Sequence, residues 1–394
     1  MGKIAGHKLV PARVSCEIVA SSDRLRQLES DWHRLWEAGE RNIFQSYHWV
    51  EAWWSTRTTA SHLFIALAWD EQKLVAILPF AIRRWSGTRI LEWAAQSVSD
   101  YCDAIAEHPA IVRLLWREVR KTGGFDIIRL KNVHPDSLIS RALADVMECR
   151  QEIGEVCLHL TSDWTDGDHW FRNLNKKKRN NWSRGKRMLS QDARLDFRQS
   201  TQSPEPQLLE QLVAMKRASM AANGIKSSSD VATLTELTRA LEKIQALRVF
   251  LVTRDESVVA ASINAVQGKA LLAYFAVYDA AFARASPGIL LMTEYTRWAF
   301  DSGLTKVDYL RGEEGFKFEF ANGAVQLNSY IEAETYWGHA ALTLHRLWQS
   351  SYRLVASRRM PNHPEIGSAY ATKAGNLRNT PARSGASPVT ETID

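Results

Sequence analysis

The sequence predicts a mixed α/β protein built from two tandem halves that share one order of elements. Three observations lead to this prediction. The chain has 394 residues, more than one hydrophobic core usually organises, so two domains are expected. Its 45% hydrophobic and 24% charged residues are typical of a folded globular chain. Strand-like and helix-like segments follow one another in a fixed order, and that order occurs twice.

The first half is expected to contain a strand, two helices, three strands, a helix, a strand, a helix and a final strand. Ser21 or Ser22 can cap the first helix, which should end at Gly39, and Ser46 can cap the second. Pro109 is a favoured first-turn residue of the helix after the three strands. The expected elements are strand 13–19, helices 21–39 and 46–54, strands 62–69, 73–84 and 88–95, helix 109–122, strand 125–133, helix 136–148 and strand 153–160.

The second half repeats this order. Gly303 should end its longest helix, as Gly123 ends the corresponding helix of the first half. The expected elements are strand 193–199, helices 206–221 and 231–244, strands 247–254, 257–266 and 269–278, helix 287–302, strand 305–310, helix 314–320 and strand 326–332.

A basic segment separates the two halves. Residues 171–190 hold eight Lys or Arg and no Asp or Glu, and Phe171, Leu174, Trp182 and Leu189 recur at helical spacing, which predicts a basic amphipathic helix. We therefore divide the chain into a flexible N-terminus (1–12), a first domain (13–162), a basic bridging helix (163–190), a second domain (191–360) that ends in a helix over 340–358, and a disordered Ser, Thr, Pro and Gly-rich tail (371–394).

Several classes of protein are disfavoured by composition. The apolar runs are too short to cross a bilayer, and the N-terminus lacks the apolar stretch of a signal peptide, so a soluble cytoplasmic protein is expected. The four cysteines lack CxxC spacing, which argues against a disulfide framework and against a metal site. The net charge of +6 suits an anionic ligand but does not choose among a nucleotide, a phosphate and an acidic polymer.

Residues 274–321 contain the features expected of a binding and catalytic site. Ser286, Pro287 and Gly288 open a helix whose first N–H groups lack partners within the helix, and such a start can hold phosphate oxygens. The following strand places Asp308 and Tyr309 in its C-terminal part, where open α/β sheets keep their ligands. The corresponding helix of the first half opens with HPAI and has no glycine, so we assign the donor site to the second half.

These residues resemble the Gcn5-related N-acetyltransferase (GNAT) superfamily, and within it the CelD-like or BioF2-like acetyltransferases associated with bacterial polysaccharide synthesis. The matching pattern is Tyr278-Asp279, Ser286-Pro287-Gly288, Gly303, Asp308 and Gly312-Glu313-Glu314 with Lys317. The resemblance extends over most of 40–335. It implies two tandem GNAT-like domains, as in the Fem peptidyltransferases, and an N-acyltransferase with acetyl-CoA or another acyl-CoA as co-substrate. The superfamily's pyrophosphate loop is reduced here to Arg284, Ser286, Pro287 and Gly288.

Site residues follow from the chemistry of acyl transfer. The attacking amine has to lose a proton, the carbonyl oxygen needs hydrogen-bond donors, and the departing thiolate benefits from a nearby acid. Asp308 and Glu314 are the alternative bases, and Tyr278 and Tyr309 are the alternative acids. The expected donor-binding residues are Arg284, Ser286, Pro287, Gly288, Ile289 and Leu290, and the expected acceptor-site residues are Asp100, Tyr101, Asp103 and Lys317.

Three functions stay open at this point. The first is an acyltransferase that acts on an amine or a sugar hydroxyl of a small molecule or glycan, in polysaccharide or cell-envelope synthesis. The second is a Fem-like aminoacyltransferase that takes its donor from charged tRNA, with the basic helix on the RNA. The third is a non-catalytic GNAT-like binding module. We expect the helical tryptophans Trp32, Trp36, Trp49, Trp53 and Trp54 to be core residues rather than a sugar-stacking surface.

Overall fold

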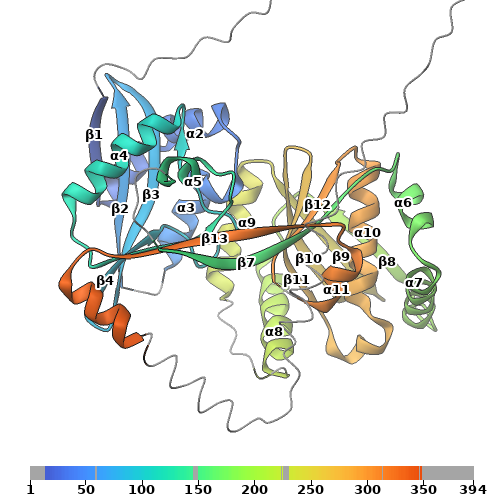
Figure 1. Cartoon of the computed structure of the whole chain (residues 1–394). Coiled ribbons are helices and arrows are strands. Elements are labelled where there is room, and N and C mark those ends of the chain that lie inside the picture. The colour runs from blue at the N-terminus through green and yellow to red at the C-terminus, as the bar shows by residue number, and fades with distance from the viewer. Residues whose placement is uncertain are drawn as a thin grey trace, which may run out of the picture.

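The computed structural model describes residues 14–57, 60–144, 150–222, 224, 230–312, 314–345 and 347, and Figure 1 shows two halves side by side. In the first half the order of elements is confirmed, although the helix expected over 21–39 divides at Leu28. The elements are β1 (Val14–Val19), α1 (Ser22–Gln27), α2 (Glu29–Ala38), η1 (Ile43–Gln45), α3 (Tyr47–Thr56), β2 (Ser61–Asp70), β3 (Lys73–Trp85), β4 (Thr88–Trp93), β5 (Ile105–Ala106), α4 (Pro109–Thr122), β6 (Ile127–Val133), α5 (Leu138–Leu143) and β7 (Arg150–Thr161).

The second half has the same order. After the bridging segment α6 (Gly167–Asn173) and α7 (Lys176–Leu189), it contains β8 (Leu195–Ser200), α8 (Pro206–Ala222), α9 (Val231–Lys243), β9 (Leu247–Arg254), β10 (Ser257–Gln267), β11 (Ala270–Tyr278), η2 (Ala280–Ala285), α10 (Pro287–Asp301), β12 (Lys306–Arg311), α11 (Gly315–Phe320) and β13 (Gly323–Ala333). Residues 336–345 are helical as well, so the C-terminal helix begins before its expected start at Ala340. The predicted tail and flexible N-terminus lie outside the described residues.

All strands belong to one mixed sheet, in the order β1-β2-β3-β4-β6-β13-β7-β12-β11-β10-β9-β8, with β5 beside β3. The last strands of the two halves are exchanged. β7 pairs with β12 of the second half, and β13 pairs with β6 of the first. Figure 1 shows both long strands running from one half into the other. The two halves therefore each contain a strand of the other.

Three hydrophobic clusters cover the two faces of the sheet. Alternate residues of β2 point to different clusters: Leu63, Ile65 and Leu67 face α2 and α3, whereas Phe64 and Ala66 face α4. The first cluster also includes α8 and α9, so both halves share a core on this face. The third cluster lies under α10 in the second half. The five tryptophans of α2 and α3 are all buried in the shared core, in agreement with the sequence interpretation.

The basic bridge differs from the single helix that the sequence predicted. It forms two helices, because Asn175 accepts a hydrogen bond from the N–H of Lys178 at 2.9 Å and caps α7, while Leu174 ends α6 with an extended backbone. Phe171 and Trp182 stack edge to face across the break. The apolar spacing therefore reflected two short helices that pack together.

Helix α7 packs closely on η2 through Gly185, where a Cβ would overlap the carbonyl oxygen of Ala285. We expect Gly185→Ala to lower the free energy of unfolding by about 1–3 kcal/mol, since overpacking forces the backbones apart. Urea unfolding measures this difference. Gly39→Ala is the matched control, because a Cβ there meets nothing nearer than 3.7 Å; an equal loss in both variants would contradict the close packing at α7.

No helix within the described ranges is long and apolar enough to cross a membrane. Cys16 is exposed, Cys102 and Cys157 are buried, and all three are free thiols. Cys149 lies outside the described residues.

Candidate acyl-transfer site

A gap in the sheet lies between β11 and β12. These parallel strands pair only through Ala270–Leu272 and Lys306–Asp308, and beyond these residues they diverge. A cavity of about 650 Å³ lies in the gap, lined by α10 and α11 on one face of the sheet and by α8 on the other. Its volume falls in the range of small-molecule sites. The gap therefore opens a passage through the sheet from one face to the other.

The equivalent gap of the first half is filled by the chain itself. β4 and β6 likewise pair over a short stretch, of two residue pairs, but the segment after β4 folds between them. Cys102 forms a parallel bridge with Val133, and its N–H donates to the carbonyl of Asn132 at 2.8 Å. The side-chain amide of Asn132 in turn donates to the carbonyl of Ser99 at 2.9 Å. Only the second half keeps its gap open among the described strands.

The start of α10 borders the cavity. Ser286 takes a left-handed conformation (φ 51°) between η2 and α10, and its side chain makes no capping bond. Its carbonyl accepts from the N–H groups of Ile289 and Leu290, while the N–H of Gly288 has no acceptor among the described residues. The sequence led us to expect several free N–H groups here, and the structure leaves one that faces the cavity.

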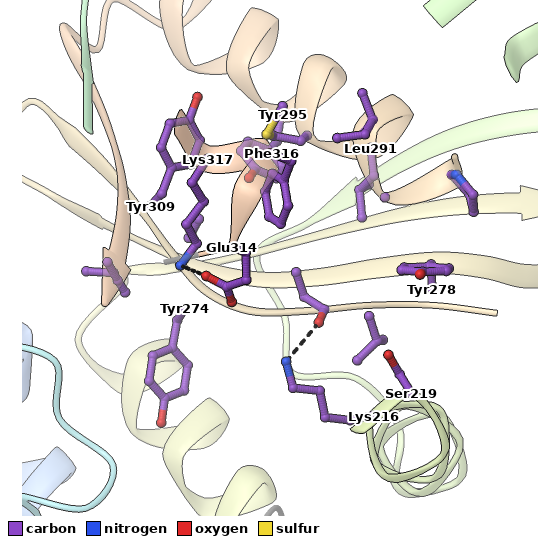
Figure 2. A pocket seen from close by; sticks show the side chains of 18 of the residues that line it. Lys216, Ser219, Tyr274, Tyr278, Leu291, Tyr295, Tyr309, Glu314, Phe316 and Lys317 are labelled. Carbon is purple, nitrogen blue, oxygen red and sulfur yellow. Dashed lines mark hydrogen bonds and ion pairs between the residues drawn. The ribbon is translucent and has the colours of Figure 1, made fainter. Parts of the chain in front are cut away.

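A charged pair occupies the corner between β12 and α11. The ammonium of Lys317 lies 2.9 Å from Glu314 Oε2 and donates to the carbonyl of Arg311 at 2.7 Å. Lys317 is buried, whereas the Glu314 side chain is 54% exposed toward the cavity. Gly312 has φ 116°, and a Cβ there would overlap the Glu314 carboxylate. Glycine at this position thus allows the carboxylate to lie against the turn. Figure 2 shows the ion pair between Lys317 and Glu314.

Asp308 lies outside the cavity. Its carboxylate accepts from the Tyr101 hydroxyl at 2.9 Å and from the N–H of Leu310 at 2.9 Å, and it pairs with Lys306 at 2.9 Å. Only 3% of the side chain is exposed. Because Tyr101 belongs to the first half, Asp308 connects the two halves at their junction. It does not line the cavity in which substrates would meet.

A second ion pair forms the floor of the cavity. Arg311 donates to Asp100 at 2.6 Å and to Asn132 at 3.3 Å, which connects β12 to the loop that fills the first half's gap. Burial raises the pKa of the Asp100 carboxyl, while the charge of Arg311 opposes this shift. Asp103 is directed elsewhere and accepts from the N–H groups of Leu138 and Ile139 at the start of α5, both at 2.9 Å.

Two tyrosines proposed as acids take different positions. Tyr278 is 38% exposed at the mouth of the cavity, with its ring 3.4 Å from the place of a Cβ on Gly288. Tyr309 contributes its buried ring to the wall, and Figure 2 shows its hydroxyl directed away from Glu314 and Lys317. Burial raises the pKa of the Tyr309 hydroxyl, which disfavours its ionisation.

Comparison with known proteins shows that the segment around the cavity is similar to a known family. Residues 176–318 match the family model of the acetyltransferase (GNAT) domain. This segment runs from α7 to α11 and contains the whole gap. No curated protein matches the sequence.

Solved structures resemble the chain over both halves, beyond the GNAT domain. One is FemX, with a TM-score of 0.53 and 9% identity over 80% of this chain and 97% of that one. Another is the C-terminal domain of a putative lysylphosphatidylglycerol synthetase from Agrobacterium fabrum, with a TM-score of 0.52 and 12% identity over 81% and 96%. A protein of unknown function from Bacteroides thetaiotaomicron gives a TM-score of 0.52 and 9% identity over 80% and 99%. These likenesses show the shared fold.

The cavity brings together most of the predicted site residues. Those that line the cavity are Asp100, Tyr278, Ser286, Pro287, Gly288, Ile289, Tyr309, Glu314 and Lys317. Those that do not are Tyr101, Asp103, Arg284, Leu290 and Asp308. Arg284 is an exposed residue of η2, and Leu290 is a residue of α10 that is buried in the third cluster.

The lining residues that sequence reasoning missed include Lys216, Tyr274, Arg311 and Phe316. Lys216 lies on α8, about sixty residues before β11, and no local pattern marked it. Its pKa is lowered by burial, although the nearby Glu314 opposes the shift. No group of three or more His, Cys, Asp or Glu that could hold a metal occurs in the described part of the chain.

Proposed function

We propose that the protein is an acyltransferase that moves an acyl group from a coenzyme A-type thioester to an amine or a sugar hydroxyl. The observation that carries the proposal is the gap between β11 and β12, which gives two substrates access to one point from opposite faces of the sheet. The GNAT domain match over the same residues supports it. An acceptor from polysaccharide or cell-envelope synthesis is the narrower form of the proposal and rests on the CelD-like resemblance.

The α10 side of the gap is suited to the donor. The N–H of Gly288 has no acceptor in the described chain and lies at the positive end of a 15-residue helix, where a phosphate oxygen is favoured. Beyond Leu272 the edge of β11 that faces β12 has no strand partner, so an extended arm with amide groups can hydrogen-bond to it. Leu291, Met292 and Phe316 provide apolar wall along this path.

Glu314 is our candidate for the general base. When bound, the thioester supplies an activated carbonyl; the new bond joins the acceptor nitrogen or oxygen to that carbon, and the carbon–sulfur bond breaks. Glu314 faces the cavity and would take the proton of the attacking group, while Lys317 holds the carboxylate in place. Tyr278 at the mouth is the candidate to protonate the leaving thiolate. Asp308 is less suited as base, since Tyr101, Lys306 and the N–H of Leu310 already engage it.

Acetyl-CoA should raise the melting temperature of the full chain if the gap binds the donor, because a ligand that prefers the folded state stabilises it. Thermal unfolding with and without the ligand measures the shift. Ala276→Trp would fill the cavity and should abolish the shift, whereas Ala280→Trp on the exposed side of η2 should keep it. No shift in the parent protein at concentrations far above micromolar would favour a binding module without a donor.

The aminoacyl-tRNA alternative rests on α7, which packs against η2 beside the donor path. The exposed cations of this helix are Lys176, Lys177, Arg184, Lys186 and Arg187. Several phosphate contacts would make RNA affinity fall steeply with salt, whereas binding of one CoA is much less sensitive. Measuring tRNA affinity at two ionic strengths separates the two donors.

A further inference from the structure

We propose that the acceptor carries an anionic group close to its nucleophilic amine and that Lys216 binds this group. The inference rests on the acyltransferase function proposed above and names the substrate class for the same cavity. The anion is an oxyanion, either a carboxylate or a phosphate, because a lysine ammonium binds both as a point charge.

The charged side chains that line the cavity are three cations and two anions. Arg311 is paired with Asp100 at 2.6 Å and with Glu155, outside the lining, at 3.2 Å, and Lys317 is paired with Glu314 at 2.9 Å. Lys216 has no carboxylate within 4.0 Å in the described chain, so it is the cation that these pairs leave over. The Lys216 side chain is partly buried and has no counter-ion there, and a bound anion would supply one.

Contacts of Lys216 leave its ammonium available. Its hydrogen bond to the carbonyl of Ala276 measures 3.5 Å, the outer limit for such a bond, and its ammonium lies 5.6 Å from the ring centre of Phe275. Figure 2 shows this ammonium and the Glu314 carboxylate directed into the same space from opposite sides. The Coulomb effect of Glu314 on the Lys216 pKa agrees with their closeness.

The position of Lys216 points to the acceptor rather than the donor. α10 lies on one face of the sheet and α8 on the other, and the cavity connects them. With the donor along α10, a nucleophile reaches the reacting carbon from the α8 face, past Lys216 and Met220. An anion on Lys216 would then hold the acceptor with its amine near Glu314, which is the geometry that deprotonation needs.

Matched pairs of amines test the inference. Thiol release from acetyl-CoA by the full chain is measured with amino acids against their amides, and with glucosamine 6-phosphate against glucosamine. We expect the anionic member of at least one pair to have a kcat/KM about 10- to 100-fold higher than its neutral partner, as for a hydrogen bond to a charged group. The responding pair distinguishes carboxylate from phosphate.

Variants of Lys216 assign the effect. Lys216→Met should lower kcat/KM for the anionic acceptor by a similar factor, mainly through KM, and Lys216→Arg should restore part of it. The control is Lys121→Met, because the Lys121 side chain is exposed on α4; this change should leave the kcat/KM values unchanged. Equal use of neutral and anionic members, or equal rates in the two methionine variants, would overturn the inference. Acetyl-CoA binding without turnover of any pair would also count against it, whereas failure to bind acetyl-CoA would instead reject the proposed function.

Discussion

Glu314→Gln is expected to lower kcat by about 10²- to 10⁴-fold with little change in donor binding, because the amide cannot accept the proton of the attacking group. The glutamine keeps the size of the side chain and a hydrogen bond from Lys317, so the fold of the corner should persist. Steady-state thiol release gives kcat, and the thermal shift with acetyl-CoA reports donor binding separately.

The matched control is Glu319→Gln on the same helix, whose side chain is exposed and does not line the cavity. Asp308→Asn completes the comparison, since Asp308 was the alternative base. We expect that change to cost stability at the junction between the halves, with kcat per folded molecule changed far less than in Glu314→Gln. A larger fall in kcat for Asp308→Asn than for Glu314→Gln would indicate that Asp308 on β12, and not Glu314, is the general base.

Arg311→Met is expected to destabilise the protein by about 3 kcal/mol at neutral pH, because it leaves the buried Asp100 carboxylate without its partner. Burial already raises the pKa of Asp100 in the folded state. For such a carboxyl the penalty is absent below the unfolded value of about 3.9 and grows as pH rises through the folded value. The deficit of the variant should therefore shrink as the pH is lowered toward 4.

Urea unfolding of the parent and Arg311→Met at pH 7 and pH 5 measures this trend. The double variant Asp100→Asn/Arg311→Met should recover part of the loss, since it removes the unpaired charge as well. If the double variant loses as much as the sum of the single ones, the two side chains act independently and the ion pair contributes nothing across the halves.

Sequence patterns predicted the order of elements well, because alternation and capping are local. Ser46, for example, caps α3 as expected, and Pro109 opens α4. The exchange of β7 and β13 could not be predicted, since strand order depends on contacts between residues that lie far apart in the chain, such as Lys306 with Thr161 and Asn328 with Val133. The break at Asn175 was missed because the apolar spacing continues across it.

For the site, the sequence pointed to Gly288 and Glu314, which mark a helix start and a turn next to a strand end; both line the cavity, and their roles stay predictions. It also favoured Asp308 on its place in β12, but the strand's register shift between Asp308 and Arg311 changes which side chains face the cavity. Arg311 and Lys216 went unnoticed, because their role follows from partners on other elements. Local sequence reports where a side chain sits along an element, and only the packed sheet decides what it faces.

The exchanged strands determine when each half can complete its part of the sheet during synthesis. β6 of the first half has to wait for β13, which leaves the ribosome almost two hundred residues later, and β12 pairs with a strand made before α6. The nascent first half thus presents an unpaired edge at β6 until β13 has been made. Both halves reach their final form together, as one late event rather than one after the other.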